Sequence, residues 1–473
     1  MDIGCSWIHG YREGSVVREL TDELGVVSHT LDRVLADTDP LYFRNATFQT
    51  RAKVVWSLKA VRRSLTSRIT FTQKIPSPDI LDPTLAAKLS KNLAAALSAA
   101  ATTTSTDTKT SLAASLLAPT SLLFGTLDST SEHHLATSLA RTLEIGMGVQ
   151  LQDVSLSCFG YEDSAKGTDA AIVGGYDALI KKLADEVEMM GGEIRLSSKA
   201  QHIGPEETLE AKVSLDIVVE NDIQRASSRL VISTIPLSLL QKNRSELFKA
   251  LSTKKVHAID KVHVGKLGKL VISYEDAWWP TDTAVFTILP TQTSSSQETS
   301  GSTGSSNTRL QDLLRSVPLV VSSFAVRSAP DDVQPTSTHP TLLIYIPVPI
   351  VAEIEGRSAS EVGQAMHEYL ATALPKDGAV PNGPQHSVLT NWSHDSYSLG
   401  ATSTPLTVRS VSAGISPVSF IELGRPESLG VKDGKPRVLF AGEHTSVNNR
   451  GSVTGAVESG LREGRRAVQL LEL

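Results

Sequence analysis

The sequence predicts a protein of more than one domain that mixes helices and strands, in the classes α/β and α+β. Its 473 residues are enough for two or three domains with large cores. Near the C-terminus, residues 438–441 form an apolar run of strand length, and apolar residues then recur at helical steps. In the middle of the chain, a helical pattern at 172–190 precedes several segments with strand patterns. Both kinds of element are therefore expected to build the cores.

Composition and charge exclude several classes of protein. Hydrophobic residues make up 40% and charged residues 20% of the chain, as in ordinary globular proteins. The net charge of −6 and the lack of a basic run argue against a nucleic-acid partner. Cys5 and Cys158 are the only cysteines, so we predict no disulfide framework and no cysteine-based zinc site. His133 and His134 lack matching ligands at metal-site spacing, so no other metal site is predicted. The longest apolar run, 342–352, contains two prolines and is too short to span a membrane.

The C-terminal stretch combines a strand, an acidic residue and a helix that begins among small residues. Glu443 follows the apolar run, and Gly455, Ala456 and Gly460 would allow close approach to the helix. A carboxylate can accept hydroxyl groups, and the free N–H groups of a helix N-terminus attract negative charge. A ligand site and an ordinary core strand with its helix explain this pattern equally well. The expected apolar stripe of the helix consists of Val453, Val457, Gly460, Leu461, Gly464, Val468 and Leu471.

Two segments of this stretch, Phe440–Thr445 and Gly451–Ala456 with Ser459 and Gly460, resemble the C-terminal FAD signature of flavin-containing amine oxidases. The polyamine oxidase branch is the most similar. The resemblance implies that Glu443 binds the ribityl chain and that the helix N-terminus points at the flavin ring. The cofactor-binding residues that it implies here are Gly442, Glu443, Ser452, Val453 and Thr454.

The first ten residues resemble another motif of this family, of the type (D/E)-L-G-x-x-W-I-H-G. The resemblance implies that Gly4, Ser6 and Trp7 lie at the cofactor and that His9 lines the catalytic site. Without the resemblance, the sequence alone would suggest a core aromatic residue for Trp7 and a loop histidine for His9.

The family's diphosphate-binding motif, G-x-G-x-x-G, is missing from the sequence. Gly146-Met-Gly148 lacks the third glycine, and Gly174-Gly175 has the wrong spacing. One explanation is a fragment or a mispredicted start, which we favour. The other is a short protein that binds FAD weakly or not at all.

Lys269 is the first choice for a catalytic residue. It shares one face of an expected strand with Leu267 and Val271. A lysine between two apolar neighbours lies either at a surface edge or in a cavity. Residues 267–275, followed by Trp278 and Trp279, resemble the family motif L-G-K-V-x-x-x-F/Y with a tryptophan after it. In that family the lysine holds a water molecule that is hydrogen-bonded to flavin N5.

Two further segments resemble cofactor-binding parts of the family. After the helix at 172–190, strands are expected at 193–196, 213–220 and 229–234, and Ala200-x-x-Ile203 stands where the family's backbone pairs with adenine. An ordinary packing unit would explain this pattern as well. Residues 392–400 resemble the family's W-x-x-D-x-x-x-x-G motif, which places Trp392 at the cofactor.

Two positions and one segment depart from the family pattern. Ala401 stands where monoamine oxidases carry the cysteine that bonds flavin, so noncovalent FAD is expected. Thr402 and the segment 448–450 lack the aromatic residues that surround the amine in many relatives. These losses place the usual substrate in doubt, although Trp392, Tyr397 or Trp7 could substitute.

The resemblance implies a two-domain flavoprotein. A discontinuous, Rossmann-like FAD-binding domain, without its N-terminal βαβ unit, would take residues 1–10, 170–245 and 430–473. A mixed-sheet and helical substrate domain would take 11–169 and 246–429. Helices are expected at 51–65 and 85–101, and low-complexity loops at 102–110 and 291–308.

The function implied is oxidation of an amine, with a polyamine as the favoured substrate and oxygen as the partner that yields hydrogen peroxide. Two alternatives stay open. One is a noncatalytic relative with impaired FAD binding, and the other is a flavin oxidase of monoamines, amino acids or methyl-lysine. The expected location is cytoplasmic, with a peroxisomal or secreted location left open, and no oligomeric state is predicted.

Overall fold

The protein is described by a computed structural model, which covers residues 4–5, 8–30, 69–72, 79–103, 107–162, 168–206, 212–281, 283, 285–290, 306–325, 339–431 and 433–472. The chain divides into two compact units, each built from separate segments. The first consists of Met1–Thr30, Ser164–Val264 and Ser396–Leu473, and the second of Leu31–Asp163 and Gly265–Asp395. The first unit takes in more residues at every boundary than the expected ranges 1–10, 170–245 and 430–473.

In the described residues of the first unit, the strands form three small sheets, whose orders are β1-β5-β2, β15-β9 and β6-β7-β8. Its strands are β1 (Ile8–Tyr11), β2 (Ser28–Thr30), β5 (Thr168–Ile172), β6 (Ser198–Pro205), β7 (Val213–Val219), β8 (Asp222–Ser228), β9 (Val231–Ser233) and β15 (Val438–Phe440). The strands β15 and β9 pair in parallel, with Val438 opposite Val231, whereas β6, β7 and β8 form an antiparallel meander.

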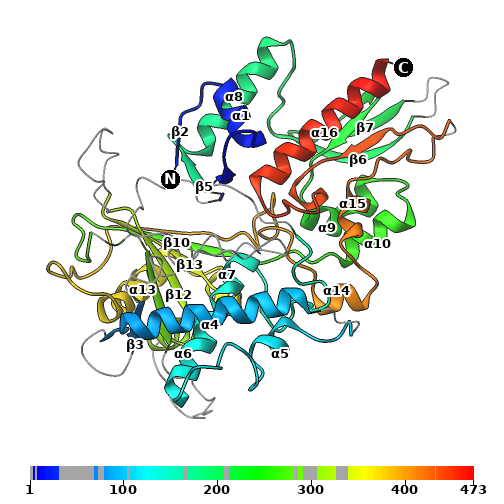
Figure 1. The fold of residues 1–473 in the computed structure, drawn as a ribbon. Helices are drawn as coiled ribbons and strands as arrows, with labels where there is room; N and C mark the ends of the chain where they lie inside the picture. The colour runs from blue at the N-terminus through cyan, green and yellow to red at the C-terminus, as the bar shows by residue number, and fades with distance from the viewer. Residues whose placement is uncertain are drawn as a thin grey trace. The chain divides into compact units, whose positions relative to one another are not determined.

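The described residues of the first unit form the helices α1 (Val16–Glu23), α8 (Tyr176–Met189), α9 (Leu237–Leu247), α10 (Thr253–Lys261), α14 (Val408–Ser412), α15 (Val418–Leu423), the 3₁₀ helix η1 (Glu443–Thr445) and α16 (Val453–Glu472). In Figure 1, helices of this unit lie beside its sheets, for example α16 next to β6 and β7. A small core joins the N-terminal part of the unit to α16. Ile8, Ala170 and Leu179 are buried in this core, and Val453 and Val457 pack against it. The predicted strand and helix at the C-terminus are thus confirmed.

The apolar stripe predicted for α16 is correct only in its first turns. Leu461, Val468 and Leu471 are exposed. The buried positions are instead Gly455, Ser459 and Glu463, four residues apart on one face of the helix. Glu463 is tolerated there because Arg462 and Arg466 bond its carboxylate, so the face packs without apolar side chains.

The strand predicted at 193–196 is wrong. The helix α8 ends at two glycines, where Gly191 has a φ of 84° and the Gly192 amide donates to the Val187 carbonyl at 2.8 Å. The chain then runs over the surface, where Leu196 is 83% exposed. The strand β6 begins only at Ser198, and β8 was not predicted at all, because its side chains are mostly polar and exposed.

The second unit is built on a seven-stranded sheet with the order β14-β10-β13-β12-β11-β3-β4. Its strands are β3 (Ile69–Thr72), β4 (Asp79–Ile80), β10 (Gly268–Ser273), β11 (Val285–Pro290), β12 (Leu319–Ser323), β13 (Thr341–Ile346) and β14 (His386–Leu389). The pair β11–β3 is parallel and the other pairs are antiparallel, so the sheet is mixed.

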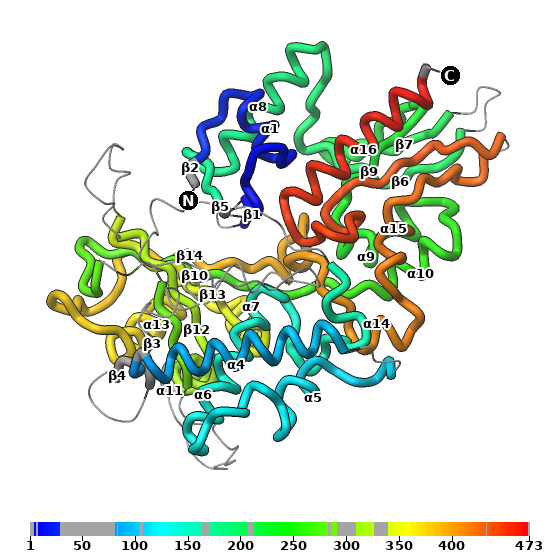
Figure 2. Tube along the Cα trace, viewed as in Figure 1, coloured from blue at the N-terminus to red at the C-terminus, as the bar shows by residue number. Residues whose placement is uncertain are grey.

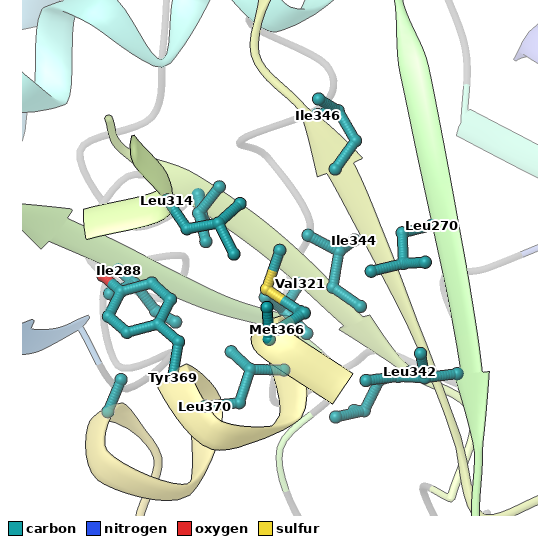
Figure 3. Close-up of a cluster of buried hydrophobic side chains, with 14 of the residues drawn as sticks. Leu270, Ile288, Leu314, Val321, Leu342, Ile344, Ile346, Met366, Tyr369 and Leu370 are labelled. Atoms are coloured by element: carbon teal, nitrogen blue, oxygen red, sulfur yellow. The ribbon is translucent and has the colours of Figure 1, made fainter. Parts of the chain in front are cut away.

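Helices cover both faces of this sheet. They are α4 (Pro83–Thr102), α5 (Leu112–Leu116), α6 (Thr130–Arg141), α7 (Leu143–Met147), α11 (Ser306–Arg315), α12 (Val348–Ile354) and α13 (Ala359–Ala373). On one face, Met366 and Leu370 of α13 point at the sheet residues Leu342 and Ile344 (Figure 3). The opposite face, which carries Tyr345, packs against Ile145 of α7. The sheet is therefore buried on both sides, and the predicted mixture of helices and strands is confirmed.

The expected helix at 85–101 is confirmed as α4, which Asp82 caps by accepting from the amides of Thr84 and Leu85. The helix expected at 51–65 lies outside the described residues. In the low-complexity loop 291–308, the last three residues belong to α11. In the loop 102–110, Asp107 forms a local turn by accepting from the Lys109 amide and the Thr110 hydroxyl. Over the described residues, we find no helix that is long and apolar enough to cross a bilayer.

A buried tyrosine–histidine pair lies in the core of the second unit. Tyr274 Oη is 3.0 Å from Nδ1 of His367, and Nε2 of His367 is 2.9 Å from the carbonyl of Pro381. Because a carbonyl can only accept, Nε2 carries the proton and Nδ1 accepts from the tyrosine. Burial lowers the pKa of His367. The folded protein therefore favours the neutral imidazole.

This pair predicts acid sensitivity of the second unit. The pKa of His367 is lower in the folded than in the unfolded chain, so its stabilising contribution is complete above the unfolded value and is lost as the pH falls through the folded one. Below about pH 6.5, we expect the unfolding free energy to fall by up to about 1.4 kcal/mol per pH unit from this group. His367→Gln should reduce this slope in urea titrations, whereas His386→Gln, on the exposed side of β14, should not. An equal slope in both variants would contradict the assignment.

Candidate functional site

The C-terminal motif forms a strand, a tight turn and a helix within the first unit. The strand β15 is buried and ends at Phe440. Gly442 then has a φ of 138°, and a Cβ at this position would lie 2.6 Å from the His444 ring. The Gly442 amide donates to Ser459 Oγ of α16 at 2.9 Å, which ties the turn to the helix. The trace in Figure 2 continues from this turn into α16.

The Glu443 carboxylate is held at the end of the strand by groups from two other segments. Its Oε1 accepts from the Ser403 amide at 3.0 Å. Its Oε2 accepts from Ser403 Oγ and from the Gly451 amide, each at 2.6 Å. Arg450 supports the same segment by donating to the Ser403 carbonyl at 2.9 Å. A half-buried carboxylate in one orientation can accept hydroxyl groups of a ligand with its remaining lone pairs.

The first turn of α16 lies next to this carboxylate in the chain. Ser452 Oγ accepts from the Gly455 amide at 3.2 Å, as an N-cap side chain does. A Cβ at Gly455 would lie 2.1 Å from the Asn449 carbonyl, so only glycine fits there. The amides of a first helical turn, here Val453 and Thr454, have no partner within the helix and can face a ligand.

Two further groups lie close to the turn. The hydroxyl of Ser233, at the end of β9 beside β15, is buried and has no hydrogen-bond partner among the described residues. A buried hydroxyl of this kind needs a polar partner, which a ligand group can supply. His444 is buried under the turn, and burial lowers its pKa although the neighbouring Glu443 opposes this effect.

The structure places the other predicted residues of the first unit as follows. His9 lies half-buried on β1, and Gly4 is exposed in a bend before it. Ser6 and Trp7 lie outside the described residues. Ala200 lies half-buried on β6 opposite Ile217, and a bulge follows it before His202. These residues keep their predicted roles as hypotheses.

Lys269 lies on β10 in the second unit and is only 5% exposed. The alternative of a lysine at the surface is therefore wrong. Its ammonium is 5.5 Å from the ring centroid of Tyr345, which is its register partner on β13. Thr390 fixes the backbone at this point, because its Oγ1 accepts from the Lys269 amide at 2.8 Å. The side chain is thus held on the face of the sheet opposite the α13 core.

Trp392 follows two residues after Thr390 and is half-buried. The loop that contains it is held by Glu355 at the end of α12, whose Oε1 accepts from the Ser393 amide at 3.2 Å. Lys269, Thr390 and Trp392 therefore come from neighbouring parts of the same unit. No group of three or more His, Cys, Asp or Glu side chains among the described residues is arranged to hold a metal ion.

Sequence reasoning missed Ser403, Thr390 and the two cations Lys255 and Arg462, described below. Ser403 contacts Glu443 from 40 positions away, and no local sequence pattern predicts this contact. Thr390 comes directly after β14, which ends at Leu389, and no sequence pattern marks it as a partner of Lys269. Arg462 belongs to the predicted helix, but its spacing carries no sign of its bonds to the turn.

Comparison with known proteins gives the family. A model of the flavin containing amine oxidoreductases matches residues 1–468. The chain is 26% identical to lysine-specific histone demethylase 2 of Homo sapiens over 332 residues, which are 68% of this chain and 34% of that protein. It is 27% identical to the corticosteroid-binding protein of Candida albicans over 236 residues, which are 49% and 44% of the two chains.

A plant protein named probable polyamine oxidase 4, from Arabidopsis thaliana, is 21% identical over 321 residues, which are 67% of this chain and 52% of that protein. The chain thus spans between about a third and about half of the length of these relatives. The family resemblance drawn from Phe440–Thr445 and the segments before it is confirmed. The chain belongs to the family of flavin containing amine oxidoreductases.

Proposed function

We propose that this protein oxidises an amine with noncovalently bound FAD, and that a polyamine is its substrate. When bound, FAD would supply the hydride-accepting chemistry that converts the amine to an imine, which water hydrolyses, with oxygen as the final electron acceptor and hydrogen peroxide as a product. The observation that supports this proposal most strongly is the Glu443 carboxylate, which three donors hold at the end of β15 beside the start of α16.

The residues present fit the ribityl and pyrimidine side of FAD. Glu443 offers acceptors to the ribityl hydroxyls, and the first amides of α16 offer donors to the ring edge that gains negative charge on reduction. The Ser233 hydroxyl, which has no hydrogen-bond partner in the described part of the chain, fits a polar ligand close to the turn. Ala401 stands at the position of the covalent cysteine, which supports noncovalent binding.

The roles proposed for the other residues follow the family pattern. Lys269 would hold the water molecule next to flavin N5, and His9 would line the amine site. Gly4, Ser6, Trp7 and Trp392 would lie against the cofactor. The backbone of Ala200 on β6 would pair with adenine in a Rossmann-like FAD domain.

The substrate class is proposed on the names of the relatives. Polyamine oxidases support a polyamine, whereas the histone demethylases support methylated lysine in a protein. A panel should decide, with peroxide release measured for spermine, spermidine, a monoamine, an amino acid and a methyl-lysine peptide. We expect the highest kcat/KM for a polyamine. A methyl-lysine peptide that is oxidised faster than every polyamine would contradict the substrate assignment.

A second candidate function rests on one observation. The sequence contains no G-x-G-x-x-G, the loop that holds the FAD diphosphate in dinucleotide-binding folds. The alternative is a noncatalytic relative that keeps the scaffold without this loop. Such a protein would be purified without flavin absorbance near about 450 nm and would release no peroxide with any amine.

A further inference from the structure

A fully buried lysine lies next to the turn Phe440–Thr445 and is not part of the proposed reaction. Lys255 on α10 has a relative exposure of 0%. Its Nζ donates to the carbonyls of Glu422 and Leu423, in the last turn of α15, at 2.9 and 2.7 Å. The same ammonium lies 4.0 Å from the ring centroid of Phe440, the last residue of β15. One cation therefore joins α10, α15 and the strand that leads to Glu443.

A second cation holds the turn from α16. The guanidinium of Arg462 donates to the Phe440 carbonyl at 3.1 Å and to Thr445 Oγ1 at 3.0 Å. It also donates to the Thr445 carbonyl at 3.3 Å. Its Nε bonds the buried Glu463 carboxylate at 2.6 Å, which orients the guanidinium plane. Phe440 and Thr445 are the two ends of the turn, so Glu443 lies between two fixed points.

Holding a cation at the Lys255 position is costly for the fold. Burial lowers the pKa of Lys255 to about 8, against the pull of nearby carboxylates. The charged or titratable groups that face it are Glu422 and Arg425 around the end of α15, Glu427, Glu463 of α16 and His444 of η1. An apolar side chain would fill this space without loss of solvation. A cost of this kind is often associated with a role at a functional site.

We propose that Lys255 and Arg462 are positioning residues that fix the turn Phe440–Thr445 and thereby aim the Glu443 carboxylate at the flavin. The assignment rests on the proposed function, because Glu443 is the group that it positions. Neither cation needs to touch the cofactor. Their charge restrains the strand end and the 3₁₀ turn, so the carboxylate loses less freedom when the ribityl hydroxyls bind.

The proposal predicts that protonation of Lys255 and order of the turn change together. Above about pH 8 the ammonium loses its proton, and with it the attraction to the Phe440 ring and the strength of its bonds to α15. If flavin binding needs the charged form, the apparent Kd for FAD rises by up to about tenfold per pH unit above that point. Arginine stays charged over this range, so Lys255→Arg should remove the pH dependence.

Hydrogen–deuterium exchange of the 473-residue chain without FAD tests the positioning directly. In Lys255→Met, we expect the amides of 438–446 to exchange about tenfold faster, because their restraint opens locally, while β7 is unchanged. Lys254→Met, which removes an exposed neighbouring lysine, is the matched control and should exchange as the wild type. Arg462→Lys should loosen the same segment, and Arg465→Lys, at an exposed position, should not. The wild type itself should loosen at 438–446 between about pH 7 and pH 9, after correction for intrinsic exchange.

Titration with FAD by flavin fluorescence, at the same two pH values, separates the two proposals. Local loosening with a raised Kd in Lys255→Met and a flat pH profile in Lys255→Arg would support the positioning role. Wild-type binding of FAD together with unchanged exchange and Kd in Lys255→Met would overturn it and leave the flavin function intact. Faster exchange throughout the unit would overturn it as well, since Lys255 would then support the whole fold. Local loosening in Lys255→Met, together with a wild type that binds no FAD, would overturn the flavin function and leave the positioning of the turn intact.

Discussion

Replacing Glu443 by glutamine should weaken FAD binding by about 100-fold, which corresponds to about 2.7 kcal/mol. The carboxylate accepts from the amide and hydroxyl of Ser403 and from the Gly451 amide. A glutamine amide turns one acceptor into a donor, so at least one of these groups would face another donor. Hydrogen bonds to a charged group contribute about 1.5–3 kcal/mol each, and the ribityl hydroxyls would lose the same charge. Titration with FAD, followed by quenching of flavin fluorescence, measures the loss.

The control for this prediction is Glu188→Gln on α8, which removes a carboxylate from an exposed position of the same unit. It should bind FAD as the wild type does. Thermal melts followed by circular dichroism should show that Glu443→Gln remains folded. An equal Kd in both variants would mean that Glu443 is a structural partner of Ser403 and takes no part in flavin binding.

Lys269→Met should lower turnover by about 10² or more, the range lost when a positioned proton-transfer group is removed. Methionine keeps the length of the side chain and its contact with Tyr345, but cannot hold a water molecule by a charged hydrogen bond. Lys269 is buried on the sheet of the second unit, where an apolar side chain of the same length is tolerated. Its replacement by methionine should therefore leave the fold intact. We expect the loss mainly in the rate of reoxidation by oxygen, measured by stopped-flow absorbance of the flavin.

Lys266→Met is the matched control, since Lys266 is exposed three residues before Lys269 and its backbone amide, which the substitution keeps, donates to the Gly148 carbonyl. It should turn over at the wild-type rate. Reoxidation of Lys269→Met at the wild-type rate would mean that the buried lysine only packs against Tyr345 and takes no part in reoxidation.

Much of the fold could be predicted because its strongest signals are local. The apolar run before Glu443 and the helical spacing after Gly451 are short-range patterns, and both elements formed where expected. The buried face of α16 could not be predicted, because Glu463 is accepted there only through its bonds to Arg462 and Arg466. Hydrophobic periodicity assumes that buried positions are apolar, and this helix violates that assumption.

The site was predicted in part for the same reason. Alternation along β10 could not decide whether Lys269 is buried, since this depends on α7 and on the opposite face of a sheet covered on both sides. Ser403 contacts Glu443 across 40 positions of the chain. Lys255 contacts Phe440 across 185 positions, the difference between residues 255 and 440. Contacts of this kind are determined by the tertiary fold and leave no periodic trace in the sequence.

The central claim, that this chain forms a flavin site around Glu443, is tested most directly by equilibrium dialysis of the purified 473-residue chain against FAD. The spectrum of the retained protein should be recorded alongside. We predict saturable binding of one FAD per chain, a perturbed flavin band near about 450 nm, and loss of both in Glu443→Gln. Retention of no FAD by the wild type, or equal retention by the wild type and Glu443→Gln, would contradict the claim.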